Sequence, residues 1–402
     1  MAERRTPLYD IHLRRASKMV KGGGDYMFPL TYTGEVEEHL NTRKNVGMQD
    51  LSTMGEVDIK GPGAERLVNR LLVNEIFDMH PGQVRYSTMV NQEGGIVDDV
   101  TAYKFSDEHF MIVTSSGPRK DSHRWIAEHA MGMSAYVTDI TNNLALIAVQ
   151  GPRSREFLLS IVRDGDIEGL KFFRFTTATI NETQLLISRS GYTGELGYEL
   201  YLPADEAQVI WEYLETQGRD FGLRPYGVAA MQSLRIEKAL PLYGPDMDQT
   251  RNPFEVGLQR WISFAKRDFV GREALLAIQD RGLNERWVGM TLASDIPATH
   301  GDPIYSISDI STFKETMFTG SEAGAQFDAE KTGEQVGYVT SSAKGHTVGK
   351  MLALGYVRVT HTYSGAKLLV VVGGRPVVAT VANTPFFDPG GVRLRAKETR
   401  TV

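Results

Sequence analysis

Runs of apolar and β-branched residues, separated by glycine-containing or polar turns, recur along the first half of the chain and predict short β-strands. These strands are expected at residues 83–90, 96–105, 109–115, 172–180, 184–189 and 199–202. Helices are expected at residues 120–131, 204–217 and 227–239. The last of these has a mostly apolar face that includes Val228 and Leu234, and Pro241 follows its end. The mixture predicts an α+β protein.

The pattern changes towards the C-terminus. Residues 306–334 are rich in Ser, Thr, Gly, Asp and Glu and have little periodicity, which favours a long surface loop. Short strands with glycine-containing turns then follow, at residues 336–341, 350–357, 366–372 and 376–382. Such spacing is typical of a small antiparallel barrel or sandwich. We place the boundary between Gly271 and Arg286, which gives one region at 1–280 and a C-terminal domain at 281–402.

One internal repeat is visible, between residues 57–67 and 147–157. Each copy reads as a short strand, a Gly-Pro turn and the start of a helix, and the two turns lie 90 residues apart. This separation is too long for a solenoid and suggests two related α+β halves. The alternative is that strand–Gly-Pro–helix is simply a common connection.

Composition restricts the function. The chain of 402 residues has no cysteine, which excludes disulfides, thiolate catalysis and thiolate-bound metals. Its formal net charge of −6 does not favour a nucleic-acid or anionic-membrane partner. No apolar run approaches the roughly 20 residues that span a bilayer, and the N-terminus does not resemble a signal peptide. We therefore expect a cytoplasmic protein with no membrane partner.

Several common kinds of site find no support. The nine histidines are scattered without the spacing of metal ligands, so no metal site is predicted. The Gly61-Pro62-Gly63 segment lacks the third glycine of a dinucleotide-binding loop, and there is no phosphate-loop lysine. No nucleophile-elbow motif is present either.

Two adjacent carboxylates follow a Gly-Gly turn in the segment from Gly94 to Tyr103. Side chains alternate along a strand, so Asp99 and Tyr103 point to one face and Asp98 points to the other. An acid and an aromatic ring on one face can clamp a flat, nitrogen-containing ligand. The alternative is a solvated carboxylate at the end of a hairpin.

A second candidate segment, residues 189–200, has three glycines within seven residues, together with two glutamates and two tyrosines. The glycines permit close backbone approach to a ligand. A carboxylate in this segment can accept two parallel hydrogen bonds from an amino-pyrimidinone edge, and the tyrosines offer flat faces for stacking. The alternative is a glycine-rich hairpin with solvated charges.

Taken together and in order, these motifs resemble the aminomethyltransferase (glycine-cleavage T-protein) family, whose members bind tetrahydrofolate. The resemblance covers nearly the whole chain. It is carried by residues 32–34, 37–40, 43–48, 54–56, 94–99, 150–152, 191–195, 233–237, 252–258, 269–275 and 385–389.

The resemblance implies three subdomains arranged as a cloverleaf, with tetrahydrofolate in a central channel. The family's catalytic aspartate falls on Asp99 and its pterin-binding glutamate on Glu199. Further folate-binding positions fall within the matched segments or beside them, on Met54, Tyr86, Tyr103, Tyr192 and Arg235.

Three positions depart from the glycine-cleavage pattern. Met231 and Gln232 stand where those members carry Arg and Asp, and Thr53 stands where they carry His. The loss of a fixed guanidinium suggests a changed orientation or mechanism. The pattern at residues 230–235 and the Phe-Phe-Asp-Pro-Gly-Gly ending look closer to the folate domains of dimethylglycine and sarcosine dehydrogenases.

The resemblance therefore predicts an enzyme that moves a methyl or methylene unit from a small methylated donor to N5 of tetrahydrofolate. Asp99 would act on the folate nitrogens, and a carrier or oxidase protein would be a possible partner. One alternative is a glycine-cleavage aminomethyltransferase that uses an aminomethyl-lipoyl carrier protein. Another is a folate-binding accessory protein without transferase activity.

Overall fold

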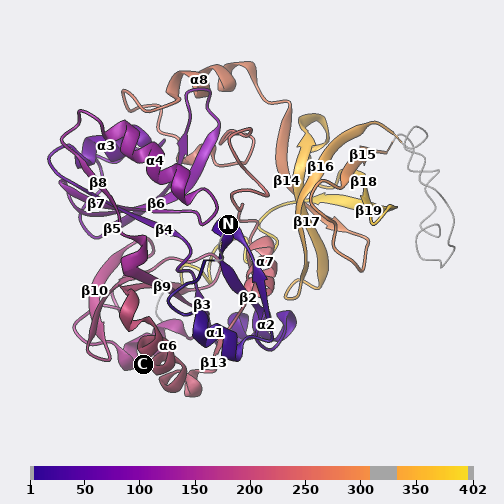
Figure 1. Ribbon diagram of the computed structural model, residues 1–402. Helices are drawn as coiled ribbons and strands as arrows, with labels where there is room; N and C mark the ends of the chain where they lie inside the picture. The colour runs from indigo at the N-terminus through magenta and orange to yellow at the C-terminus, as the bar shows by residue number, and fades with distance from the viewer. Residues whose placement is uncertain (1–3, 308–332, 397–402) are drawn as a thin grey trace.

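Two sheets form two lobes on one side of the molecule, and a closed barrel forms the third lobe (Figure 1). The computed structural model describes residues 4–307 and 333–396. The expected α+β class, cloverleaf arrangement and C-terminal antiparallel barrel are confirmed.

The first lobe contains a five-stranded antiparallel sheet in the order β5-β6-β7-β4-β8. Its strands are β4 (Gly55–Lys60), β5 (Gln83–Val90), β6 (Ile96–Ser106), β7 (His109–Thr114) and β8 (Tyr136–Asp139). Two helices, α3 (Ala64–Leu71) and α4 (Arg119–Ala130), cover one face of this sheet. The core between them is apolar and includes Ile59, Leu67 and Ile126. Asp99 and Tyr103 of β6 lie on the opposite face of this sheet.

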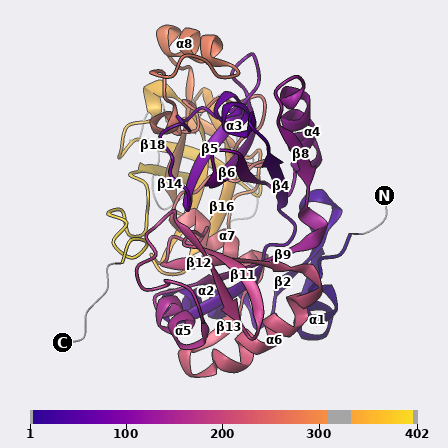
Figure 2. The same cartoon turned by 90° about the vertical axis from the view of Figure 1, so that its left-hand side faces the viewer.

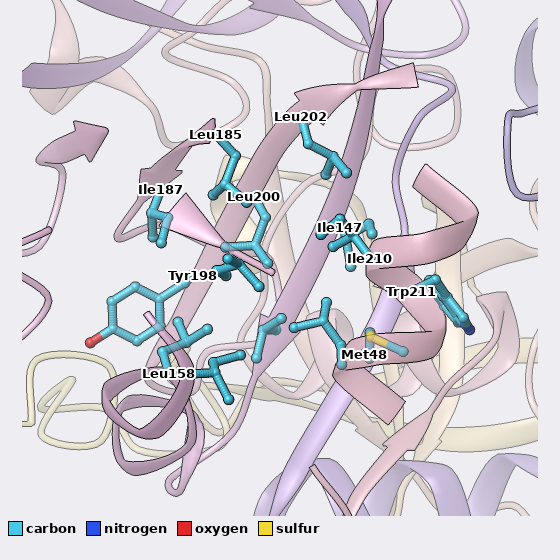
Figure 3. Packing of buried hydrophobic residues seen from close by; sticks show 14 of the residues in the cluster. Met48, Ile147, Leu158, Leu185, Ile187, Tyr198, Leu200, Leu202, Ile210 and Trp211 are labelled. Atoms are coloured by element: carbon cyan, nitrogen blue, oxygen red, sulfur yellow. The ribbon is translucent and has the colours of Figure 1, made fainter. Parts of the chain in front are cut away.

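The second lobe contains a six-stranded sheet in the order β10-β11-β12-β9-β3-β13, in which β13 runs parallel to β3. Its strands are β3 (Val46–Asp50), β9 (Leu144–Gln150), β10 (Phe175–Ile180), β11 (Thr183–Ser188), β12 (Gly197–Pro203) and β13 (Leu223–Pro225). The helices α1 (Tyr9–Arg15), α5 (Ser154–Ile161) and α6 (Ala207–Gln217) contribute side chains to its core. Figure 3 shows Trp211 of α6 and Leu158 of α5 in this core with Met48 of β3.

The two sequence repeats take the same local form. Gly61 follows β4 and Gly151 follows β9, with φ of 115° and 132°, and an eight-residue helix starts three residues later in each copy. A Cβ on Gly151 would lie 2.2 Å from the carbonyl oxygen of Asn45, so this turn requires glycine. The strand that opens each repeat also pairs with the last strand of a three-stranded meander. Strand β4 pairs with β7 of the β5-β6-β7 meander, and β9 pairs with β12 of the β10-β11-β12 meander.

The third lobe is the barrel, closed in the order β14-β17-β16-β15-β18-β19. Its strands are β14 (Glu285–Leu292), β15 (Pro303–Ser306), β16 (Gln335–Gly345), β17 (Lys350–Arg358), β18 (Lys367–Val372) and β19 (Arg375–Ala382). The first two were not expected, and the expected loop at 306–334 lies mostly outside the described residues. The proposed boundary at residue 280 stays a prediction.

The remaining elements connect the lobes. They are β1 (Lys18–Lys21), β2 (Met27–Thr31), α2 (Glu35–Lys44), α7 (Val228–Glu237) and α8 (Arg272–Arg281). Helix α7 contacts α2, β2 and the barrel strand β16, and Figure 2 shows it between the second lobe and the barrel. The strand expected from residue 172 begins only at Phe175, because Phe173 has a φ of 57° and breaks the extended backbone.

Candidate functional site

Asp99 lies on β6 and is half-buried, with a hydrogen bond to each carboxylate oxygen. The hydroxyl of Tyr86, on the adjacent strand β5, donates to Oδ2 at 3.1 Å. The hydroxyl of Ser115, just after β7, donates to Oδ1 at 3.1 Å and also lies 3.3 Å from the backbone oxygen of Asp99. Two neighbouring strands therefore hold this carboxylate in place while it keeps some exposed surface.

Burial raises the pKa of Asp99 to about 6, although the hydrogen bonds from Ser115 and Tyr86 act in the opposite direction. The same burial, together with the negative charge of Asp99, raises the pKa of Tyr86 well above its ordinary value, so Tyr86 remains a donor. A carboxylate that is ionised at neutral pH but close to its pKa is suited to accept and return a proton.

Glu199 lies on β12 and is the second half-buried carboxylate of the site. Its Oε2 accepts hydrogen bonds from the hydroxyl of Ser190 at 2.6 Å and from that of Tyr201 at 3.5 Å. Ser188 in turn lies 2.8 Å from Ser190, hydroxyl to hydroxyl. Both bonds go to Oε2. Within residues 4–307 and 333–396 no hydrogen bond to Oε1 is seen, so this oxygen can accept from a ligand with N–H donors. Burial raises the pKa of Glu199, and the hydrogen bonds oppose this shift.

Tyr103 and Met54 belong to one apolar cluster between the first two lobes, which also includes Tyr201. The Tyr103 hydroxyl lies 2.8 Å from that of Tyr201, and their rings meet edge to face with centroids 5.4 Å apart. Tyr103 is fully buried, whereas Met54 is half-exposed. Tyr103 therefore supports the site indirectly, through its contact with Tyr201, whereas the exposed part of Met54 can contact a ligand directly.

Tyr192 and Arg235 lie on the side of the site nearest α7. The Tyr192 hydroxyl donates to the backbone oxygen of Pro241 at 2.5 Å. Burial raises the pKa of Tyr192, the positive charge of Arg235 lowers it, and the negative charge of Asp99 raises it further. Its ring is half-buried and remains a candidate ligand contact.

Arg235 is 1% exposed and its guanidinium is occupied by protein partners. It donates to Asp246 Oδ2 at 2.6 Å, to Ser341 Oγ of the barrel at 2.8 Å and to the side-chain oxygen of Gln232 at 2.7 Å. It therefore joins α7 to the barrel. The expected role in folate binding stays a prediction, and these contacts favour an indirect, positioning part in it.

The three departures from the glycine-cleavage pattern have local structural roles. Gln232 binds Arg235, as described above. Met231 packs against a small cluster of apolar residues around Leu234 on α7. Thr53 is buried, with its hydroxyl 2.7 Å from that of Ser116. All three side chains are uncharged.

The hydroxyls that hold the two carboxylates were missed in the sequence. Ser115 and Ser190 are the main examples, since each binds an acid from a different strand or turn. The only available signal was the placement of Ser190 inside the glycine-rich segment. Nothing in the local sequence links Ser115 to Asp99, because their contact depends on the register of β6 with β7.

The described residues offer no competing metal site, since no group of three His, Asp or Glu side chains is placed to hold an ion within 4–307 and 333–396. No helix in this part of the chain has the length and apolar character needed to cross a membrane. The site instead combines two accessible carboxylates with the rings of Tyr86 and Tyr192. This combination fits a flat heterocycle that carries several N–H groups.

Comparisons with known proteins agree with this arrangement. Residues 8–266 match the model of the GCVT N-terminal domain, and residues 286–388 match that of the glycine cleavage T-protein C-terminal barrel domain. An aminomethyltransferase of Halothermothrix orenii is 35% identical over 96% of this chain and 100% of its own length. One from Thermotoga maritima is 36% identical over 97% of this chain and 99% of its own length.

A solved structure with a similar fold is that of the glycine cleavage system aminomethyltransferase T from Bartonella henselae. It superposes with a TM-score of 0.84 at 27% sequence identity, and the match covers 96% of this chain and 99% of that one.

Proposed function

This chain belongs to the aminomethyltransferase (glycine-cleavage T-protein) family, and we propose that it transfers the one-carbon unit of an aminomethyl group from a lipoyl-bearing carrier protein to tetrahydrofolate. It is a tetrahydrofolate-dependent one-carbon transferase, as the family is. The identity of the donor is the part that is proposed. The support for it is that relatives matching over nearly the full length are named aminomethyltransferases.

The observation that carries the site assignment is the placement of Asp99. Its carboxylate is half-buried, is held by Tyr86 and Ser115, and has its pKa raised to about 6. Folate supplies two nitrogens, N5 and N10, that bond to the one-carbon unit. When both bonds form, two protons must leave these nitrogens, while the amine and the thiol that depart take up one proton each. A single acid–base group beside the nitrogens can move a proton in each direction.

The other side chains hold the folate in position. Glu199 would bind the pterin edge through its open Oε1, and Tyr86, Tyr192 and Met54 would pack against the ring system. Tyr103 and Arg235 would support these contacts from behind. Such positioning supplies much of the rate of a bimolecular transfer.

Demethylation of a small methylated donor is the competing proposal. It rests on the departures at Thr53, Met231 and Gln232, because these remove an arginine, an aspartate and a histidine from the glycine-cleavage pattern. The expected closeness to dimethylglycine and sarcosine dehydrogenase folate domains gains no support from the relatives described above. We therefore place the aminomethyl donor first.

The donor is tested by incubating the purified protein and tetrahydrofolate with an aminomethyl-loaded lipoyl carrier protein, and in parallel with N-, S- and O-methyl donors. The aminomethyl reaction must yield methylene-tetrahydrofolate and one equivalent of ammonia. Methyl-tetrahydrofolate without ammonia, from one of the methyl donors alone, would favour the demethylase instead. A control with boiled protein measures the background from formaldehyde that a donor releases, because formaldehyde reacts with tetrahydrofolate without an enzyme.

The pH dependence of the reaction should follow Asp99. Because Asp99 must be ionised to accept a proton and has a pKa of about 6, kcat/KM for the donor at saturating folate should fall about tenfold for each pH unit below 6. The measurement is a pH profile between 4.5 and 8. An acidic limb near pH 4, the ordinary aspartate value, would mean that a different group controls the rate.

Replacement of Glu199 by Gln should weaken folate binding more than it slows the reaction. The amide keeps an oxygen that can accept from Ser190, but it loses the negative charge and the second acceptor oxygen for the pterin. A hydrogen bond to a charged group contributes about 1.5–3 kcal/mol, so we expect KM for folate to rise about 10- to 150-fold. Steady-state kinetics with folate varied will check this. Glu206→Gln, on the same lobe but outside the site, is the matched control, and an equal effect of both changes would remove Glu199 from the folate site.

A further inference from the structure

Asp98, next to the proposed catalytic residue, is fully buried and has an incomplete set of hydrogen bonds. Its Oδ2 accepts from the hydroxyl of Ser122 on α4 at 2.6 Å and from the backbone N–H of Ser115 at 3.2 Å. Its Oδ1 is buried and has no partner among the described residues. Two hydrogen bonds to one oxygen do not replace the water that a carboxylate loses on burial.

Ser115 links the two neighbouring acids. Its backbone N–H binds Asp98, and its hydroxyl binds Oδ1 of Asp99. The two side chains leave opposite faces of β6, so this one residue after β7 is the shared support. Any shift of Ser115 away from Asp98 would also move the hydroxyl that orients Asp99.

Three of the ionisable groups that interact electrostatically with Asp98 are acids. They are Asp99 on the same strand, Tyr86 on β5 and Tyr243 in the segment after α7. The contact that α4 contributes is the neutral hydroxyl of Ser122. Two adjacent carboxylates in such surroundings do not both carry a charge at low cost. Asp99 has a donor on each oxygen and some exposure, so the charge is better placed there.

We propose that Asp98 is an uncharged positioning residue, which holds Ser115 against Asp99 and leaves the single negative charge of the pair on Asp99. The inference rests on the proposed role of Asp99 in the reaction. The proton on Asp98 can lie on Oδ2, where the 2.6 Å separation from Ser122 Oγ suits an O–H···O bond in either direction. In agreement, burial and the neighbouring charge of Asp99 raise the pKa of Asp98 to about 8.

The sign of the pH effect on stability follows. An unfolded Asp98 loses its proton near pH 4, while the folded one keeps it to about pH 8, so rising pH between these values favours the unfolded chain. Asp98→Asn removes this term and keeps the side chain's shape. The difference in Tm between Asp98→Asn and the wild type should therefore increase from pH 4.5 to pH 8 and then level off.

Kinetics test the positioning part. Asp98→Ala, which frees the Ser115 N–H, should lower kcat about tenfold with little change in KM, and Asp98→Asn, which restores an acceptor, should return kcat to within about threefold of the wild type. The acidic limb near pH 6 should stay in place in Asp98→Asn, because the acid it replaces is already neutral there.

A Tm difference that is flat or falls with pH, or an acidic limb that moves down by a pH unit in Asp98→Asn, would show that Asp98 is charged and overturn the proposal. Equal kcat values for Asp98→Ala and the wild type would show that Asp98 does not position Ser115 for the reaction. Because the Tm measurement needs neither donor nor folate, it stays informative if Asp98→Ala does not fold. It also stands apart from the test of Asp99→Asn, whose full turnover would refute the acid–base role of Asp99 and leave the protonation of Asp98 untouched.

Discussion

Asp99→Asn is expected to lower kcat by about 10²–10⁴-fold, the usual contribution of a positioned acid–base group. Asparagine has the size of aspartate. Its amide oxygen can accept from one of the two hydroxyls, Ser115 or Tyr86, and its NH2 group can donate to the other, so the fold and the Kd for folate should change little. It cannot take up a proton in the reaction, and it no longer carries the negative charge of Asp99. Steady-state turnover, together with folate titration by calorimetry, measures both quantities on the same preparation.

The control for this variant is Asp280→Asn, an exposed aspartate on α8. It makes the same chemical change away from the site and should leave kcat unaltered. If Asp99→Asn turns over at the wild-type rate, Asp99 is not the acid–base group. If it loses folate binding as well as turnover, its main role is in binding.

Arg235→Met is expected to lower the free energy of unfolding by about 3–5 kcal/mol, the cost of breaking a buried ion pair by removing one partner. Arg235 and Asp246 are 1% and 0% exposed in their side chains and lie 2.6 Å apart. The change leaves the charge of Asp246 buried, with only hydroxyl and backbone donors, from Thr340, Ser341 and Leu242. It also removes the bonds that tie α7 to the barrel.

Urea denaturation of Arg235→Met and of Arg124→Met provides the comparison. Arg124 pairs with Asp121 on the exposed surface of α4, where an ion pair contributes only about 0–1 kcal/mol. The double variant Arg235→Met/Asp246→Leu should recover part of the lost stability, because no unpaired charge remains. A loss below 1 kcal/mol in Arg235→Met would mean that the α7–barrel junction does not depend on this pair.

Much of the fold could be predicted from local sequence. The strand at Gln83–Val90 was predicted with its observed ends, since β-branched residues and a following turn mark it clearly. The Gly-Pro turns at Gly61 and Gly151 were equally visible, because their positive φ demands glycine. Strands β14 and β15 were missed, since their edges depend on partners distant in the sequence that close the barrel.

The site was predicted in part. Strand alternation placed Asp99 and Tyr103 on one face, and the structure adds that Tyr86 binds Asp99 directly from the adjacent strand. Full burial of Tyr103 and the occupied guanidinium of Arg235 could not be foreseen, because both result from packing between lobes. The same holds for Ser115, whose two contacts exist only once β7 lies against β6.

The measurement that tests the central claim most directly is a crystal structure of the protein with tetrahydrofolate bound. We predict that the reacting nitrogens of the folate lie within hydrogen-bond reach of the Asp99 carboxylate, directly or through one water, and that Glu199 binds the pterin edge. Folate bound with these nitrogens far from Asp99, or in a part of the molecule that excludes Glu199, would contradict the account.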